Sequence, residues 1–497
     1  MLETLFLALA VGGGTAPTSP GRIQEGLRQP AGETPAAFET GLQAPEGIDR
    51  TAAPAVREPR IRARDAQPSP SPEQQVAAKA PQQSTSGIMQ IGKTPEVPME
   101  EVPFFYTVTI KGGPMGTGTG YKERFMIFAP DQSKPSPLLV VFHKFGTSEL
   151  DAWVNTQFFQ EAWSRGWHIM APLSSTDVHF GNPLGQQNTQ VALEWMTDNF
   201  NIRPDRIYGV GFSMGGGAAL SYAAQHVDPT KPMFAAVVDH TGGISLNDTY
   251  LNEPSAQFIF DFFFGDGTPG SADPWKMTAA SMFDFNPGTL AVDDQTNMAR
   301  NLKYMPIKVF RVSNDPLAYL KVQCDVFANY LTNRGFVHTY EIVDGHTHLW
   351  AHLSERKSLV WLSKKKLTLP SAGRVLAHQD GRFFFFTVDQ IAAETFSPFD
   401  WTITASLNKL RVWRTGNLTS LTFDTVEAGL DPSQMLTIDM ATGDGVPVTY
   451  VLRDIAATPT TVERDSVPTT AYLYDPVEKT LTLQETDGGN HLWEVTP

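Results

Sequence analysis

Cysteine is almost absent from this chain of 497 residues, in which Cys324 is the only one. A single thiol cannot form a disulfide within the chain, so a fold held together by disulfides is excluded and cysteine usage says nothing about the compartment. We expect Cys324 to be a buried apolar side chain in a helical segment, because free cysteines are commonly buried.

Positive charge is also scarce. The chain has 38 Lys and Arg against 53 Asp and Glu, which gives a formal net charge of −15 at pH 7. A surplus of negative charge argues against nucleic acid or an anionic membrane surface as a partner. We therefore predict a partner that is a small-molecule or polymeric substrate.

The N-terminal region has no apolar run long enough to span a membrane, because its apolar core covers only residues 5–11. Residues 1–16 resemble a secretory signal peptide, although Glu3 stands where a basic residue is expected. We expect a secreted, periplasmic or cell-surface protein. Residues 17–101 are rich in Pro, Ala and Gln without apolar periodicity, which predicts a disordered linker.

The most informative motif present is Gly-Phe-Ser-Met-Gly at residues 211–215. A short apolar strand precedes it and an Ala-rich helix follows, so Ser213 is predicted to sit on a sharp strand-to-helix turn. Free backbone N–H groups at the start of that helix favour developing negative charge. This context predicts that Ser213 is a nucleophile.

Three other predicted strands end in polar residues. His143 follows residues 137–142, Asp315 follows residues 307–312, and both His346 and His348 follow residues 337–343. The carboxyl ends of parallel strands meet at one edge of a sheet, where such folds place their sites. The order of oxyanion element, serine, acid and histidine is the one that hydrolases of this type follow.

On these motifs, residues 104–366 resemble an α/β-hydrolase. Within that fold the segment is similar to the secreted esterases that include polyhydroxybutyrate depolymerases, feruloyl esterases and acetylxylan esterases. The resemblance rests on residues 211–216, on Pro-Asp-Arg-Ile-Tyr at 204–208, and on Gly345-His346. It implies an α/β fold with a mostly parallel, doubly wound sheet, and serine hydrolysis of an unspecified substrate. The family usually has His-Gly where this chain has His143-Lys144, so the choice of oxyanion donor stays open.

The expected chemistry assigns one role to each residue. His346 would take the proton from Ser213, and Asp315 would orient the imidazole. Backbone N–H groups of Met214 and Phe145 would bind the oxyanion. Two alternatives remain open, because His348 competes with His346 as the base and Asp344 or Asp266 could replace Asp315.

A metal site is the other interpretation of the same histidines, since His346, His348 and His352 cluster near Asp344. Two histidines separated by one residue can share zinc. The chain lacks the His-Glu-x-x-His helix, and the serine turn already explains a histidine there. We therefore predict no metal and no other cofactor.

The predicted catalytic domain covers residues 102–369. Within it, residues 244–305 do not fit a strand–helix repeat and are rich in phenylalanine, which favours a cap-like insertion over the site. Trp153, Trp275 and His348 are predicted to bind substrate. The alternative for the insertion is an ordinary packed helical excursion.

Residues 370–497 change to an alternating pattern with frequent turns, which predicts a β-sandwich accessory domain. Examples of the pattern are residues 382–388, 401–405 and 409–413. One interpretation is a polymer-binding module with exposed Trp401, Trp413 and Tyr474. The other is a structural appendage with these aromatic residues in its core.

Taken together, the sequence predicts a serine-dependent carboxylic ester hydrolase that acts through an acyl-enzyme and needs no cofactor. Its expected substrate is an extracellular ester, a polyester or a plant-polymer ester. The alternatives are a serine peptidase of the prolyl-oligopeptidase type and an inactive hydrolase-fold binding protein.

Overall fold

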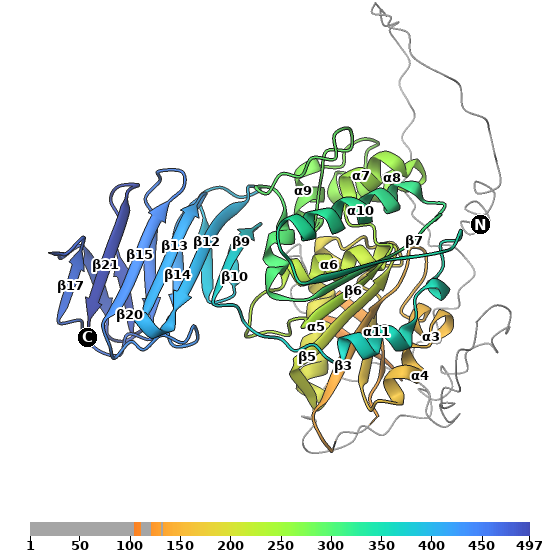
Figure 1. The fold of residues 1–497 in the computed structure, drawn as a ribbon, viewed down its shortest axis with the longest axis horizontal. Coiled ribbons are helices and arrows are strands. Elements are labelled where there is room, and N and C mark those ends of the chain that lie inside the picture. The colour runs from red at the N-terminus through yellow and green to blue at the C-terminus, as the bar shows by residue number, and fades with distance from the viewer. Residues whose placement is uncertain (1–103, 111–120, 131–132) are drawn as a thin grey trace, which may run out of the picture. The chain divides into compact units, whose positions relative to one another are not determined.

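The computed structural model describes residues 104–110, 121–130 and 133–497 (Figure 1). The predicted signal peptide at 1–16 and the predicted linker at 17–101 lie outside the described residues. None of the helices in the described part of the chain is both long and apolar enough to cross a membrane.

The N-terminal half of the described chain is built on one eight-stranded sheet in the order β1-β2-β4-β3-β5-β6-β7-β8. β2 pairs antiparallel with both β1 and β4. All other neighbouring strands are parallel: β3 pairs with β4 and with β5, and β6, β7 and β8 follow in order. The strands are β1 (Phe104–Ile110), β2 (Tyr121–Phe128), β3 (Ser136–Phe142), β4 (His168–Pro172), β5 (Ile202–Phe212), β6 (Ala236–His240), β7 (Ile307–Val312) and β8 (His338–Val343).

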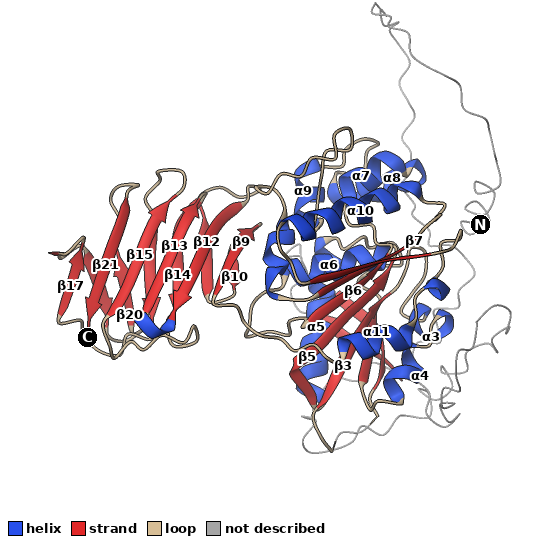
Figure 2. Cartoon of the chain, in the orientation of Figure 1, coloured by secondary structure: helices blue, strands red, loops and turns tan. Residues whose placement is uncertain are grey.

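Helices cover both faces of this sheet (Figures 1 and 2). They are α3 (Asp151–Asn155), α4 (Phe158–Trp163), α5 (Pro183–Asn199), α6 (Met214–Gln225), α10 (Ala318–Asn333) and α11 (Glu355–Leu362). Alternate residues of β3 separate the two faces, because Leu138 packs with α5, α6 and α10 while Leu139 packs with α3, α4 and α11. The predicted doubly wound α/β sheet is therefore confirmed, and Cys324 is buried on the α10 side.

The segment between β6 and β7 contains α7 (Leu246–Asn252), η2 (Pro254–Ala256), α8 (Gln257–Phe264), α9 (Pro274–Ala280) and η3 (Met298–Tyr304). Phe260 and Phe264 on α8 pack against Met214, the residue that follows the predicted nucleophile. This part of the predicted insertion therefore lies directly against the start of α6.

Residues 372–496 form two β-sheets, in the orders β10-β11-β14-β16-β20-β19 and β18-β17-β21-β15-β13-β12-β9 (Figure 2). Phe386 and Leu421 from the first sheet share one core with Val412 and Ile438 from the second, so the sheets form a sandwich. The strands are β9 (Ala372–Ala377), β10 (Gly381–Phe383), β11 (Phe386–Gln390), β12 (Ser397–Thr404), β13 (Lys409–Thr415), β14 (Leu418–Asp424), β15 (Leu436–Thr442), β16 (Thr449–Arg453), β17 (Thr461–Arg464), β18 (Val467–Pro468), β19 (Tyr472–Asp475), β20 (Thr480–Leu483) and β21 (Asn490–Thr496).

One detail of the sandwich differs from the sequence-based expectation, and a second agrees for Trp401 with the interpretation that places the aromatic residues in the core. Residues 382–388 are not one strand, because Phe383 of β10 pairs with Phe386 of β11 across a tight turn in which Phe384 has a φ of 54°. Trp401 is fully buried in the core, so it cannot be an exposed polymer-stacking residue. Trp413 remains partly exposed, with the Arg411 guanidinium over its ring.

Buried polar contacts connect the sandwich to η3. The Asn301 amide accepts from the Leu376 N–H at 2.8 Å and donates to the Leu376 carbonyl at 3.1 Å. Arg300 forms an ion pair with Asp400 at 2.8 Å, and both side chains are more than nine-tenths buried. Leaving any of these buried groups without its partner would cost about 1–3 kcal/mol, so the insertion is fixed from the sandwich side as well.

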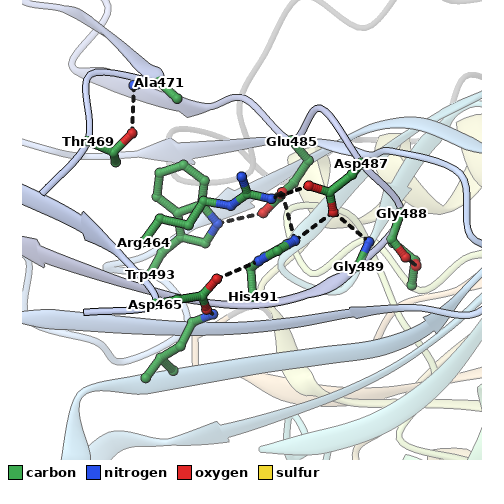
Figure 3. A network of polar contacts seen from close by, with 12 residues as sticks. Arg464, Asp465, Thr469, Ala471, Glu485, Asp487, Gly488, Gly489, His491 and Trp493 are labelled. Atoms are coloured by element: carbon green, nitrogen blue, oxygen red, sulfur yellow. Dashed lines mark hydrogen bonds and ion pairs between the residues drawn. The ribbon is translucent and has the colours of Figure 1, made fainter. Parts of the chain in front are cut away.

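A charged network near the N-terminal end of β21 predicts that the stability of the protein depends on pH (Figure 3). The two ring nitrogens of His491 donate to Asp465 and to Asp487, each at 2.7 Å, and Arg464 bonds Glu485 and Asp487 in the same network. Burial opposes the charged imidazole, but the two carboxylate hydrogen bonds outweigh it and raise the pKa of His491. Because the folded pKa is raised, the stabilisation is complete below the unfolded pKa of about 6.5 and is lost as the pH rises through the folded pKa.

We therefore expect His491→Gln to lower the melting temperature more at pH 6 than at pH 9, measured by thermal unfolding. His346→Ala is a suitable control, since His346 is exposed and lies on a loop of the catalytic domain. An equal loss at both pH values would contradict a charged role for His491.

Candidate active site

Ser213 occupies the turn between β5 and α6 with φ 57° and ψ −125°, a strained conformation for a residue with a side chain. Its N–H donates to the His240 carbonyl at 3.0 Å, and its carbonyl accepts from Gly216 at 3.0 Å. A Cβ on Gly211 would lie 2.0 Å from the Gly215 carbonyl oxygen, and one on Gly215 would lie 2.4 Å from the Phe142 carbonyl oxygen. The glycines of the motif are thus required by close backbone approach, as the sharp-turn interpretation expects.

Asp315 and His348 form a hydrogen-bonded pair beside this turn. The Asp315 Oδ2 atom accepts from His348 Nδ1 at 2.7 Å, and its Oδ1 accepts from the Leu317 N–H at 2.9 Å. The His348 ring packs on Phe212, the residue before Ser213, at 4.5 Å between ring centroids. Nε2 of His348 is buried and has no hydrogen-bond partner among the described residues.

His346, the histidine that we expected to pair with Asp315, does not do so. It is exposed, and the carboxylate of Asp315 is occupied by His348. Gly345, which had favoured His346, has another reason to be glycine: a Cβ there would lie 2.6 Å from the His352 ring. His352 in turn bonds Thr347 at 2.7 Å and so fixes the residue before His348.

The two alternative acids lie elsewhere. Asp344 is exposed and accepts from Ser313 Oγ at 3.0 Å, and Asp266 accepts from the Thr268 hydroxyl at 2.6 Å in an exposed loop. Neither contacts His348, so Asp315 is the acid that the geometry favours.

Asp151 connects the loop after β3 to the loop that carries His348, and sequence reasoning missed it. Its buried Oδ2 accepts from the Lys144 N–H at 3.2 Å and from the Trp350 Nε1–H at 2.7 Å. The Trp350 ring lies 5.2 Å from Phe212. The only sequence signal was an aspartate at the start of a helix, which is common at helix N-termini for capping reasons alone.

Two backbone N–H groups of the loop after β3 are engaged within the chain. The Lys144 N–H is engaged by Asp151, and the Gly146 N–H donates to Asp177 at 2.8 Å. Phe145 lies between them. Met214 is the first residue of α6, so its N–H has no acceptor one turn earlier within the helix. That Met214 and Phe145 donate to the oxyanion stays a prediction.

His143 has a structural position in the same loop. Its ring nitrogens lie 2.9 Å from the Lys144 carbonyl and 3.1 Å from the Leu173 carbonyl, and the side chain is buried. It ties the loop after β3 to the loop after β4, which Glu123 also holds by accepting from the Ser174 N–H at 2.7 Å. Burial raises the pKa of Glu123 to about 7.

An aromatic wall extends from the loop after β3 to the insertion. The Phe145 and Phe180 rings lie 5.5 Å apart, and Phe180 lies 4.7 Å from Phe260 on α8. All three pack in the same apolar cluster as Met214. Phe260 is fully buried and Phe180 is nearly so, which leaves Phe145 as the partly exposed ring of this wall.

The predicted substrate-binding tryptophans lie elsewhere. Trp153 packs edge-on against Phe159 at 5.2 Å, in the core between the sheet, α4 and α11. Trp275 packs against Phe396 of the sandwich region at 6.0 Å. His348 is the third predicted substrate-binding residue, and it is paired with Asp315 instead. The structure therefore brings none of the three into the aromatic wall.

Asp239 and His240 end β6 beneath the serine turn, and both are fully buried. Burial raises the pKa of Asp239 to about 8 and lowers the pKa of His240 well below its usual value. The His240 ring stacks on Phe212 at 4.6 Å. At neutral pH Asp239 and His240 are therefore both largely uncharged, so neither adds a second charge to the site that contains Asp315.

The raised pKa of Asp239 predicts how stability depends on pH. A carboxyl whose pKa is about 8 when folded and about 4 when unfolded contributes stability below pH 4 that is lost as the pH rises to about 8. Asp239→Asn should remove this loss, so the variant should gain free energy of unfolding relative to the wild type between pH 5 and 9. Urea unfolding at several pH values measures this difference in the free energy of unfolding. Asp344→Asn is the control, because Asp344 is exposed. The prediction is contradicted if the free energy of unfolding depends on pH in the same way in Asp239→Asn and in the wild type.

Among the described residues, the group with metal-ligand spacing is Glu485, Asp487 and His491, in the sandwich rather than at the serine turn. Arg464 already places a guanidinium between Glu485 and Asp487. The Arg464 guanidinium therefore balances the charge of these two carboxylates, and the group does not fit a resident metal.

The strand order, the serine turn after β5, and Asp315 and His348 after β7 and β8 define an α/β-hydrolase-fold protein. Solved structures similar to this chain include a ferulic acid esterase, with 17% identity over 53% of this chain and 98% of that one, at a TM-score of 0.37. An S-formylglutathione hydrolase from Agrobacterium tumefaciens is similar at 10% identity over 53% and 95% of the chains, with a TM-score of 0.38. A puromycin-hydrolyzing peptidase from Mycobacterium tuberculosis is similar at 16% identity over 52% and 38%, also at 0.38. No protein-family model matches the sequence, and no curated protein does.

Proposed function

We propose that this protein is a serine-dependent carboxylic ester hydrolase in which Ser213, His348 and Asp315 form the catalytic triad. The observation that carries the proposal is the hydrogen bond from His348 to Asp315, with the His348 ring packed on the residue before Ser213. Serine is a poor nucleophile without an adjacent base, and this arrangement supplies one together with its orienting acid.

The reaction would proceed in two balanced steps. Ser213 Oγ attacks the ester carbonyl carbon while His348 Nε2 takes the hydroxyl proton, and the carbonyl π electrons move to oxygen. The N–H groups of Met214 and Phe145 bind that oxyanion, each contributing about 3 kcal/mol of transition-state stabilisation. Collapse of the intermediate expels the alcohol, which receives the proton from His348. In the second step, water attacks the carbonyl carbon of the acyl-enzyme while His348 takes its proton. Collapse of this intermediate returns the proton to Ser213 and releases the carboxylic acid.

Asp315 would orient the base. Its hydrogen bond fixes the proton on Nδ1 of His348, which leaves Nε2 as the base, and its charge stabilises the imidazolium that forms. The partly exposed ring of Phe145, which Phe180 and Phe260 support from behind, favours an ester with an apolar or aromatic acyl group.

The test is hydrolysis of p-nitrophenyl esters of increasing acyl length by the wild type and by Ser213→Ala. We expect turnover by the wild type and a loss of about 10⁴-fold or more in the variant. Matched p-nitroanilides separate the ester reaction from the peptidase alternative. A folded wild type that cleaves none of these esters would refute the proposal, and exclusive cleavage of the anilides would favour the peptidase.

A further inference from the structure

A cleft of about 970 Å³ lies away from the serine turn. Neither Ser213, Asp315 nor His348 lines it. Its walls come from α5, the end of α6, the insertion around α9, and the β10–β11 end of the sandwich. Its volume is at the upper end of the range for small-molecule sites, so it has room for a ligand of several rings.

Side chains that both donate and accept hydrogen bonds dominate the polar lining. Glutamine supplies most of them, and they are Gln186, Gln187, Gln190, Gln225, Gln379 and Gln390. Two histidines, His226 and His378, join them; burial lowers their pKa values to about 3 and about 4, so both rings are neutral at pH 7. The NH₂ groups of four of these glutamines already donate within the chain. The amides of Gln187 and Gln379 remain to offer a carbonyl and an NH₂ group to ligand hydroxyls that donate and accept at once.

The charged lining groups largely neutralise one another. Lys231 pairs with Glu194 at 3.2 Å, and Arg382 pairs with Asp228 at 3.3 Å. The remaining charged groups on the lining are Lys276, Asp380 and Glu394. This balance leaves no cluster of cations for a phosphate or carboxylate ligand, and the lining therefore favours an uncharged one.

Several lining side chains have a polar atom that no group in the described part of the chain satisfies. They are Gln186 Oε1, His226 Nε2, Trp275 Nε1 and His378 Nδ1. Gln186 is only 5% exposed, which makes an unsatisfied amide oxygen there costly. These four atoms are enclosed by the chain itself, so a ligand in the cleft would meet the exposed parts of the lining instead.

Aromatic surface accompanies these polar groups, since Phe263, Phe264 and Trp275 also line the cleft. A sugar ring has the matching chemistry, with an apolar C–H face for an aromatic ring and hydroxyls around its edge for amides. We propose that this cleft binds a neutral oligosaccharide through the glutamine-rich lining and Trp275. The proposal does not depend on ester hydrolysis, because binding can be measured without turnover.

The test is isothermal titration of the full chain with three uncharged hexasaccharides: β-1,4-linked xylose, β-1,4-linked glucose and α-1,4-linked glucose. We expect at least one to bind, with affinity reduced about tenfold or more in Trp275→Ala and in Gln187→Leu. Trp275 packs on Phe396, so Trp275→Ala carries a risk to folding; Gln187, which is only partly buried, provides the second variant. Thermal unfolding checks that both variants are folded.

Trp413→Ala is the matched control, because Trp413 is a partly exposed tryptophan of the sandwich that does not line the cleft. It should bind the hexasaccharide as the wild type does. The proposal is overturned if none of the three sugars binds at millimolar concentration, or if folded Trp275→Ala and Gln187→Leu both bind normally. Loss of binding in Trp413→Ala alone would also overturn it, since the sugar site would then lie on the sandwich face.

Discussion

Replacing His348 with alanine should lower kcat/KM for p-nitrophenyl acetate by about 10⁴-fold or more, whereas His346→Ala should change it by no more than about threefold. The two residues are only two positions apart, but His348 alone is hydrogen-bonded to Asp315, at 2.7 Å. Without His348 the Ser213 hydroxyl has no base, and the remaining catalysis comes from the oxyanion donors and substrate binding. Steady-state kinetics on the two purified variants measures the difference.

The paired substitution is its own control, because both variants lose an imidazole from the same loop. Melting temperatures should confirm that each is folded. Loss of activity in His346→Ala with activity retained in His348→Ala would reverse the assignment. Equal and small effects in both would mean that neither histidine is the base.

Asp151→Ala should lower kcat by about 100-fold with a smaller change in KM. Asp151 touches no substrate; it is a positioning residue, which joins the Lys144 backbone to the Trp350 ring through one carboxylate oxygen. Removing it frees the loop next to Phe145 and the loop that carries His348 at the same time. A displacement of about 1 Å between the reacting groups is enough to cost two orders of magnitude.

Asp151→Asn is the matched control, since an amide can keep an acceptor oxygen toward both Lys144 and Trp350. It should retain kcat within about tenfold of the wild type. A merely structural role would lower the melting temperature of Asp151→Ala without separating kcat from KM. That result, or equal losses in the alanine and asparagine variants, would contradict the positioning role.

Much of the catalytic domain could be predicted because its elements are encoded locally. A continuous apolar run marks β3, which is buried on both faces, and the Gly-x-Ser-x-Gly turn at 211–215 lies between β5 and α6 as expected. The prediction of Asp315 as the acid followed from its place after β7. Each of these depends on a pattern within about ten residues, which sequence periodicity and turn chemistry can report.

The sandwich shows where local patterns mislead. Residues 382–388 alternate well enough to predict one strand, but the chain reverses at Phe384 and Phe385. Four consecutive phenylalanines are buried because both arms of this hairpin face the core. Burial of these side chains in the folded core thus decides the structure of residues 382–388, although their alternating pattern predicted a single strand.

By itself, the sequence determined the fold class and predicted the nucleophile and the order of the catalytic elements, since these depend on residues close together in the chain. The tertiary structure alone decided that His348 rather than His346 faces Asp315, and that Asp151 joins two loops. Asp315 and His348 are separated by 33 positions, and Asp151 and Trp350 by 199. Contacts between such distant residues depend on how the intervening loops run over the end of the sheet, and no local periodicity specifies that path.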